Sequence, residues 1–266
     1  MEKSIQNPSE SVFSDSLTRS EFYGKVFLYF GLGILISSVF AILIGFIFNK
    51  VYPMYEFTEN GTIIQNTASL NAYMILTIVS GIGLLVTSIF ISFRTLRNKK
   101  SIFFPYLLYA TFMGVLLSSC SYYIEVGPYT IGLALLITSI CFLSMCALGY
   151  ITHQKMHIWF RIFISLIIVG LLLCLTNFII IPFAIYGGNY DAFYASMWIY
   201  WVSEVVILLA YLAITAFDMA RIRKIAESGA GSDNLALYCA LNLYSDFVIL
   251  FLYILRFIGL ASSKRD

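Results

Sequence analysis

The sequence predicts an all-α integral membrane protein built as a seven-helix transmembrane bundle, and two observations support this prediction. Hydrophobic residues make up 60% of the 266 residues and charged residues 11%, whereas globular proteins have roughly 45–50% and 25%. The apolar residues also gather into seven runs, each long enough to cross about 30 Å of hydrocarbon as a helix. These runs are residues 26–48, 72–93, 102–123, 129–151, 162–186, 193–217 and 235–260.

Runs of this length favour helices over a membrane β-barrel. No water satisfies backbone groups inside the bilayer, and barrel strands need only about 10 residues of alternating polarity. One seven-helix membrane domain is therefore expected over residues 22–262. Residues 1–21 are polar and rich in serine, without the arrangement of a signal peptide, and they predict a short cytoplasmic tail.

The distribution of lysine and arginine predicts the orientation, because cytoplasmic loops carry an excess of both. The amino terminus is predicted to be cytoplasmic. Seven crossings leave Arg256, Lys264 and Arg265 outside, against this rule, whereas a re-entrant last helix removes the conflict, and both arrangements stay open. The basic residues on the predicted cytoplasmic side are Lys3, Arg19, Lys25, Arg94, Arg97, Lys99, Lys100, Lys155, Arg161, Arg221, Arg223 and Lys224.

The longest external loop, residues 49–71, contains a turn signal. Asn60-Gly61 is flanked by Tyr55, Phe57 and Ile63, and Asn-Gly between apolar residues favours a hairpin with a type I′ turn. We therefore expect a small external β-hairpin.

The last two runs each carry a polar stripe. Residues three, four or seven apart share one face of a helix. Two such stripes on consecutive helices should face each other, because facing lipid would leave them unpaired. The stripes are Glu204, Tyr211, Thr215 and Asp218 on the sixth run, and Cys239, Asn242, Asp246 and Tyr253 on the seventh.

An ionisable residue deep in a membrane is a functional hypothesis in itself. Asp246 lies about 16 Å into its helix, at 1.5 Å per residue, with no adjacent cation on that helix. Asp218 lies near the cytoplasmic end of its run, where a surface ion pair with Arg221 is the alternative. Depth alone would pair Asp246 with Glu204 rather than with Asp218.

Other classes of protein find little support. A net charge of +2 is too small to indicate nucleic-acid binding, and the five cysteines form no CxxC pair. His153 and His157 lack the glutamate of a zinc-protease helix, and the sequence contains no nucleophile elbow or phosphate loop. An intramembrane aspartyl protease also needs two aspartates, but Leu243-Tyr-Ser precedes Asp246 in place of Gly-x-Gly. No enzyme and no covalently bound cofactor are predicted.

Two segments resemble a known family. Leu241-Asn-Leu-Tyr-Ser-Asp-Phe-Val-Ile-Leu-Phe-Leu-Tyr-Ile-Leu-Arg-Phe-Ile-Gly259 resembles the signature of the Bax inhibitor family (transmembrane Bax inhibitor motif proteins), especially of its bacterial members. The likeness extends to Ala216-Phe-Asp-Met-Ala-Arg-Ile-Arg-Lys224 and, more weakly, to the basic junction after the second run. The resemblance implies a location in the bacterial inner (cell) membrane.

The resemblance also implies a mechanism. Asp218 and Asp246 would share a proton as a pH sensor in a calcium-permeable leak, and an arginine at the end of the second run, Arg94 or next Arg97, would latch onto Asp218. The chain departs from the family in having no acidic residue in its second and fourth runs.

Physical chemistry independently allows this function. Calcium prefers several hard oxygen ligands, which Asp218, Asp246, Glu204 and Asn242 could supply on converging faces. Two carboxylates in contact cannot both ionise cheaply. The sequence therefore predicts a pH-sensitive calcium leak channel or transporter, with the lipid bilayer, calcium ions and protons as partners and no nucleic acid. A non-conducting regulatory membrane protein is the main alternative.

Overall fold

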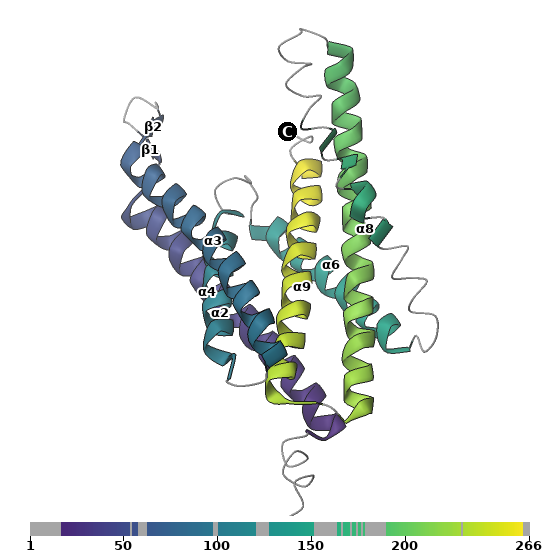
Figure 1. Ribbon diagram of the computed structural model, residues 1–266. Coiled ribbons are helices and arrows are strands. Elements are labelled where there is room, and N and C mark those ends of the chain that lie inside the picture. Colours follow the sequence, from purple (N-terminus) through teal and green to yellow (C-terminus); the bar gives the residue numbers. More distant parts are fainter. Residues whose placement is uncertain are drawn as a thin grey trace, which may run out of the picture. The chain divides into compact units, whose positions relative to one another are not determined.

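The computed structural model describes residues 17–53, 55–57, 63–97, 101–120, 128–151, 190–229 and 231–262, with short helical pieces between residues 164 and 178. Helices dominate this part of the chain, and one short hairpin accompanies them (Figure 1). The elements in order are α2 (Arg19–Phe46), a π-helical extension η1 (Ile47–Val51), β1 (Tyr55–Phe57), β2 (Ile63–Gln65), α3 (Thr67–Arg97), α4 (Phe103–Ser118), α6 (Pro128–Ile151), α8 (Tyr190–Ser228) and α9 (Asp233–Ser262).

Five of the described helices are long and apolar enough to cross a membrane. These spans are Arg19–Val51, Thr67–Thr95, Thr130–Ile151, Trp198–Ser228 and Asp233–Gly259. The third predicted run forms only the shorter apolar helix α4, and most of the fifth run, residues 162–186, lies outside the described residues. The chain is a multi-pass membrane protein, but the described residues do not supply all seven predicted spans.

The outer face of α3 agrees with a lipid environment. Apolar side chains recur every three or four residues along this helix and are 46–66% exposed. A soluble monomer rarely presents so long an apolar face to water, whereas a membrane helix presents it to lipid tails. The exposed residues on this face are Met74, Ile75, Ile78, Val79, Ile82, Leu85, Val86, Ile89, Phe90 and Phe93.

The chain divides into two compact units, and the last two boundaries between them along the sequence fall inside helices. The first unit contains Met1–Glu125 and Lys224–Tyr244, and the second contains Val126–Arg223 and Ser245–Asp266. Helices α8 and α9 therefore contribute residues to both units.

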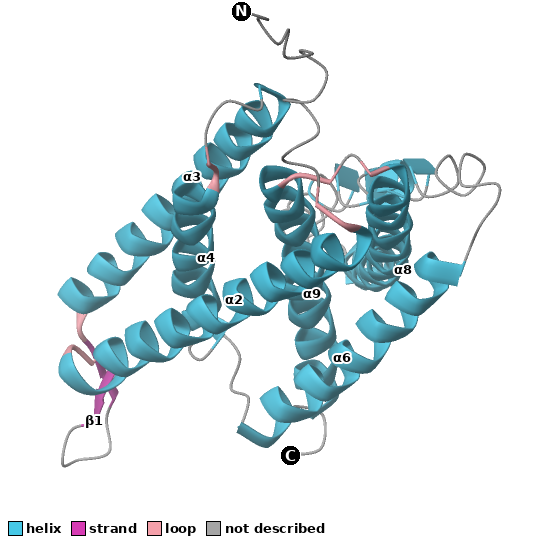
Figure 2. Ribbon diagram, turned by 90° about the horizontal axis from the view of Figure 1, so that it is seen from below, coloured by secondary structure: helices cyan, strands magenta, loops and turns pink. Residues whose placement is uncertain are grey.

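In the first unit, α4 packs against both α2 and α3 (Figures 1 and 2). The buried Tyr106 of α4 donates a hydrogen bond to the carbonyl of Tyr29, at 2.5 Å. A Cβ atom on Gly114 would lie 2.6 Å from the carbonyl oxygen of Ser37. The absence of a side chain at Gly114 is therefore what allows α4 to approach α2 so closely.

The amino-terminal end of α2 is fixed to the start of α9 within the first unit. Thr18 and Glu21 form a capping box that starts α2 at Arg19, and Lys25 pairs with Asp233. The helix thus begins inside the segment 1–21 that was predicted as a tail. Local capping explains the difference, because it starts a helix before the apolar run begins.

The predicted hairpin is confirmed, but its register differs from the expected one. Strands β1 and β2 are antiparallel and pair Tyr55 with Gln65 and Phe57 with Ile63. A two-residue type I′ turn at Asn60-Gly61 would instead pair Phe57 with Ile64. The observed register leaves five residues between the paired ends, and those residues lie outside the described part of the chain.

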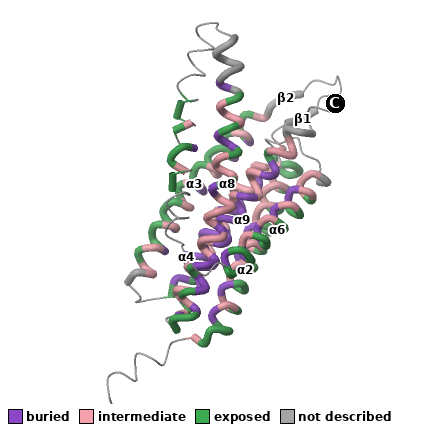
Figure 3. Tube along the Cα trace, turned by 90° about the vertical axis from the view of Figure 1, so that its right-hand side faces the viewer, coloured by how far each residue is buried: buried purple, intermediate pink, exposed green. Residues whose placement is uncertain are grey.

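The second unit contains α6, most of α8 and the carboxyl-terminal half of α9. Phe142 of α6 packs edge-on against Phe247 of α9, with ring centroids 5.4 Å apart. The alternating buried and exposed positions of these helices are visible in Figure 3. Because α9 is one unbroken helix from Asp233 to Ser262, its length favours a full crossing over a re-entrant loop.

Candidate functional site

The facing surfaces of α8 and α9 form a polar seam in the second unit, made by Tyr211 and Asp218 of α8 and by Asp246 and Tyr253 of α9. The helices are consecutive, and Gly229 directly after α8 has a φ of 69°, which suits the left-handed residue that commonly follows a helix. The rings of Tyr211 and Tyr253 lie 6.1 Å apart.

The tyrosine contact fixes the level of the two aspartates. Tyr211 lies seven residues before Asp218, and Tyr253 lies seven residues after Asp246. On two antiparallel helices, equal steps from a contact reach the same level along the axis. The structure therefore brings Asp218 and Asp246 to one level, where the charge of Asp218 acts on Asp246.

Asp246 lies in an enclosed environment. Its residue is only 6% exposed, and its charge also acts on the thiol of Cys146 on α6 and on the hydroxyl of Tyr211. Among the described residues, no group hydrogen-bonds to its buried Oδ2 atom. A buried carboxylate oxygen without a partner is costly, so this position is suited to hold a proton or to meet an ion.

The helix that carries Asp218 is held firmly against α6 on either side of it. A Cβ atom on Gly149 of α6 would collide with the backbone carbonyl of Ala216, so the two helices touch at this glycine. Arg223 is 9% exposed and donates a hydrogen bond to the carbonyl of Tyr150, with its guanidinium 5.5 Å from that ring. These contacts fix α8 just before and just after Asp218.

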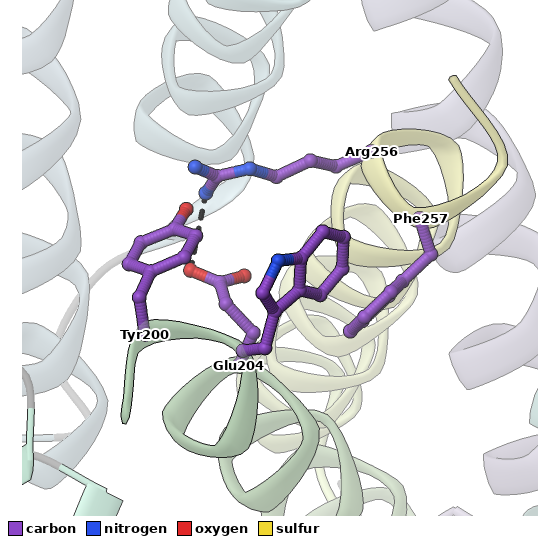
Figure 4. Close-up of a pocket in the computed structure, with 5 residues that line it drawn as sticks. Tyr200, Glu204, Arg256 and Phe257 are labelled. Atoms are coloured by element: carbon purple, nitrogen blue, oxygen red, sulfur yellow. Dashed lines mark hydrogen bonds and ion pairs between the residues drawn. The ribbon is translucent and has the colours of Figure 1, made fainter. Parts of the chain in front are cut away.

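Glu204 lies further along α8 and meets a different partner. Its Oε1 atom accepts a hydrogen bond from Nη1 of Arg256 on α9, at 3.1 Å (Figure 4). The guanidinium lies over the ring of Tyr200, 5.0 Å from its centroid. Trp201 and Phe257 pack beside the pair with ring centroids 5.7 Å apart, so aromatic side chains flank the ion pair.

The ion pair corrects the pairing that depth alone predicted. Glu204 does not complete a carboxylate pair with Asp246, because the charge it meets is that of Arg256. The sequence reasoning treated Arg256 only as a basic residue near the carboxyl-terminal end and missed it as a partner. The signal that could have predicted this ion pair is the position of the two residues along consecutive helices. Glu204 lies before Asp218 on α8 and Arg256 lies after Asp246 on α9, so on antiparallel helices both lie in the same direction from the aspartates.

The remaining predicted site residues are Asn242, Arg94 and Arg97. Asn242 lies one turn before Asp246 on α9 and is half-buried. Arg94 is half-buried near the end of α3, with its guanidinium 5.3 Å from the ring of Phe90, and the side chain of Arg97 lies outside the described part. Because Arg94 belongs to the first unit and Asp218 to the second, their pairing stays a prediction.

The described residues contain no group of three or more His, Cys, Asp or Glu side chains that could hold a metal ion. The polar seam offers two carboxylates at one level, with Asn242 nearby on the same helix. A set of this size suits transient contact with a passing cation better than a permanent calcium site, which takes 6–8 oxygen ligands.

Comparison with known proteins extends over nearly the whole chain. The family model described as "Inhibitor of apoptosis-promoting Bax1" matches residues 19–263. The chain is 26% identical over 257 residues to "Uncharacterized protein YrjE" of Lactococcus lactis, covering 95% of both chains. It is 28% identical over 258 residues to an "Uncharacterized protein" of Borreliella burgdorferi, covering 91% of this chain and 93% of the relative.

Proposed function

Because the chain belongs to the Bax inhibitor family, we propose that it is a pH-sensitive calcium leak channel or transporter of a bacterial cell membrane. In this proposal the chain crosses the membrane seven times, with its amino terminus in the cytoplasm. Asp218 and Asp246 form the proton-sharing pair that sets the conductance.

One observation supports the proposal above the others: Asp218 and Asp246 lie at the same level of the polar seam, and Asp246 is almost fully buried. Little water reaches such a pair, and the repulsion between two ionised carboxylates is large there. The pair therefore favours keeping one proton, and it titrates in two separated steps. Losing the shared proton adds a negative charge to the seam, which strengthens its attraction for a cation such as the guanidinium of Arg94.

The proposed latch is an ion pair between Arg94 and Asp218. A guanidinium on Asp218 neutralises the seam from one end and holds the leak closed. Protonation of Asp218 weakens this attraction, so acidification first releases the arginine. The conductance then changes near the upper apparent titration step of the aspartate pair.

The experiment is calcium flux into proteoliposomes of the purified protein, measured against pH. Asp246→Asn removes the repulsion but keeps the shape of the side chain, so the flux–pH curve should move toward acid or flatten. Asp233→Asn is the matched control, because Asp233 lies on the same helix, about 20 Å from Asp246 at 1.5 Å per residue, and pairs with Lys25. It should leave the midpoint of the curve unchanged.

Two results would reject the proposal. Wild-type flux equal to that of empty liposomes at every pH would favour a non-conducting regulatory membrane protein, in which the aspartates only specify packing. A flux–pH curve that Asp246→Asn leaves unaltered would remove the pair from the mechanism while keeping conduction. Intramembrane proteolysis is the weaker alternative, since the Gly-x-Gly-Asp motif is absent around Asp246.

A further inference from the structure

A pocket of about 470 Å³ lies in the first unit between α3 and α4, far along the chain from the polar seam. Its α3 wall includes Val86, Phe90 and Arg94, and its α4 wall includes Phe104 and Leu108, with Ser101 just before α4. The volume falls within the range of about 300–1,000 Å³ that is typical of ligand sites.

The pocket is amphipathic along the helix axis. Val86, Phe90 and Arg94 follow one another at four-residue steps, so they form a single stripe on α3. The stripe runs from an apolar end to a cation over eight residues, about 12 Å at 1.5 Å per residue. A ligand that fills it must therefore be apolar at one end and anionic at the other.

The apolar walls open outward rather than toward the protein interior. Val86 is 60% exposed, Phe90 49% and Phe104 70%. The outer face of α3 is apolar, so in a membrane-spanning protein it lies against lipid. Side chains as exposed as these therefore contact lipid chains. The pocket is thus reached from the hydrocarbon of the bilayer.

The charged end lies where α3 ends and α4 begins. Arg94 lies three residues before the end of α3, and it is the basic residue that lines the pocket. The amino-terminal end of α4 adds the positive end of its helix dipole. Among the described residues of the first unit, no carboxylate forms an ion pair with Arg94, so its guanidinium offers donors to an anion.

We propose that this pocket binds an acidic glycerophospholipid from the leaflet at the α3–α4 junction. The headgroup phosphate accepts hydrogen bonds from Arg94, and one acyl chain covers Val86 and Phe90. Basic pockets between membrane helices are the usual sites for acidic lipid headgroups. A free phosphate ion would leave the apolar walls uncovered. A zwitterionic lipid also has a phosphate, but it brings its own cation close to Arg94, so the net negative charge of an acidic headgroup is favoured. The proposal does not depend on ion conduction.

The test measures lipid retained by the purified full-length protein from an equal mixture of phosphatidylglycerol and phosphatidylcholine, by native mass spectrometry. We expect a preference for the acidic lipid of about five-fold, which corresponds to about 1 kcal/mol for one cation near an anionic surface. Arg94→Gln should abolish this preference, and Arg94→Lys should keep most of it because the charge remains.

Two tryptophan substitutions separate a lipid site from simple attraction of anions. Val86→Trp fills the pocket and should lower the retention of both lipids. Leu85→Trp is the matched control, since Leu85 is 66% exposed on the same helix but does not line the pocket, and it should bind lipid as the wild type does. Both positions are exposed, so both variants should fold.

Equal retention of the two lipids by the wild type, or unchanged retention in Val86→Trp, would overturn the proposal. A further measurement with added inorganic phosphate tests whether the pocket binds a free phosphate ion instead of a lipid headgroup. If phosphate alone protects the protein against thermal unfolding through Arg94, and Val86→Trp does not alter that protection, the pocket binds a free anion and not a lipid. Flux is measured in none of these arms, so a failure of the proposed leak leaves this result intact.

Discussion

Glu204 of α8 and Arg256 of α9 form an ion pair in which the two partners differ strongly in exposure, with 3.1 Å between Oε1 and Nη1. The side chain of Glu204 is 9% exposed and that of Arg256 is 49% exposed. The second carboxylate oxygen of Glu204 is buried and has no hydrogen-bond partner among the described residues. The glutamate therefore depends on the arginine more than the arginine depends on the glutamate.

This asymmetry predicts unequal effects of the two single substitutions. Arg256→Gln leaves the buried carboxylate of Glu204 without a partner and should lower the free energy of unfolding by about 1–3 kcal/mol, the cost of an unsatisfied buried group. Glu204→Gln leaves an arginine that can turn outward, so the loss should be smaller. The double variant should be more stable than Arg256→Gln alone. Thermal unfolding of the purified variants measures this, and equal losses in the two single variants would contradict it.

The contact between α6 and α8 predicts the effect of one added methyl group. Gly149→Ala places a Cβ atom against the carbonyl of Ala216, and overpacking of this kind costs about 1–3 kcal/mol. Gly132→Ala on the same helix is the control, because no atom lies within 4 Å of the added Cβ there. Since alanine favours a helix over glycine, that change should stabilise by up to about 1 kcal/mol. A Gly149→Ala variant that unfolds at the wild-type temperature would argue against the close approach.

The proposed latch predicts non-additive effects on calcium leak. Arg94→Gln and Asp218→Asn should each raise the resting leak, and the double variant should add little, because one interaction is removed twice. The proteoliposomes should contain only zwitterionic lipid, so that no acidic headgroup competes for Arg94. Fully additive effects would mean that the two residues act independently.

The distribution of basic residues predicts the topology. A reporter fused after Lys100 or Lys224 should be found on the cytoplasmic side, and a reporter at Asn60 on the external side. Protease protection of the reporters in sealed membrane vesicles measures the side. If the reporters after Lys100 and Lys224 were external and the reporter at Asn60 cytoplasmic, the predicted orientation would be wrong. The proposed pair of Arg94 and Asp218 would then lie on the external side of the membrane.

The sequence was sufficient to predict several of the described helices, but not their ends. The run 129–151 corresponds closely to α6, because both ends of the helix coincide with the ends of the apolar stretch. The run 193–217 ends eleven residues before α8 does. Hydropathy detects contact with lipid, whereas the last turns of α8 are held by buried Met219, Ile222 and Ala226 beside polar neighbours. Hydropathy therefore does not predict the part of a helix that continues past the apolar stretch.

That Tyr211 and Tyr253 face each other could also be predicted, because helical spacing gives the face on which a residue lies. It does not give the axial register between two helices, which here follows from the contact between Tyr211 and Tyr253. Arg256 lies ten residues after Asp246, about 80° away from the stripe at 3.6 residues per turn. Its long side chain reaches around the helix to Glu204, and a pattern based on Cα positions misses such a contact.

The burial of α9 has a consequence for how the protein enters the membrane during synthesis. In its most apolar stretch 61% of the residues are buried, against 11–28% in the other four candidate spans, and it is also the least apolar of the five. A helix with an aspartate near its middle partitions poorly into lipid by itself. Because α9 follows the other spans in the chain, its binding surfaces have already left the ribosome when it emerges. We therefore expect α9 to enter the bilayer at the same time as it packs against the other helices. If those helices are misfolded, α9 should stay outside the bilayer, where proteases can reach it.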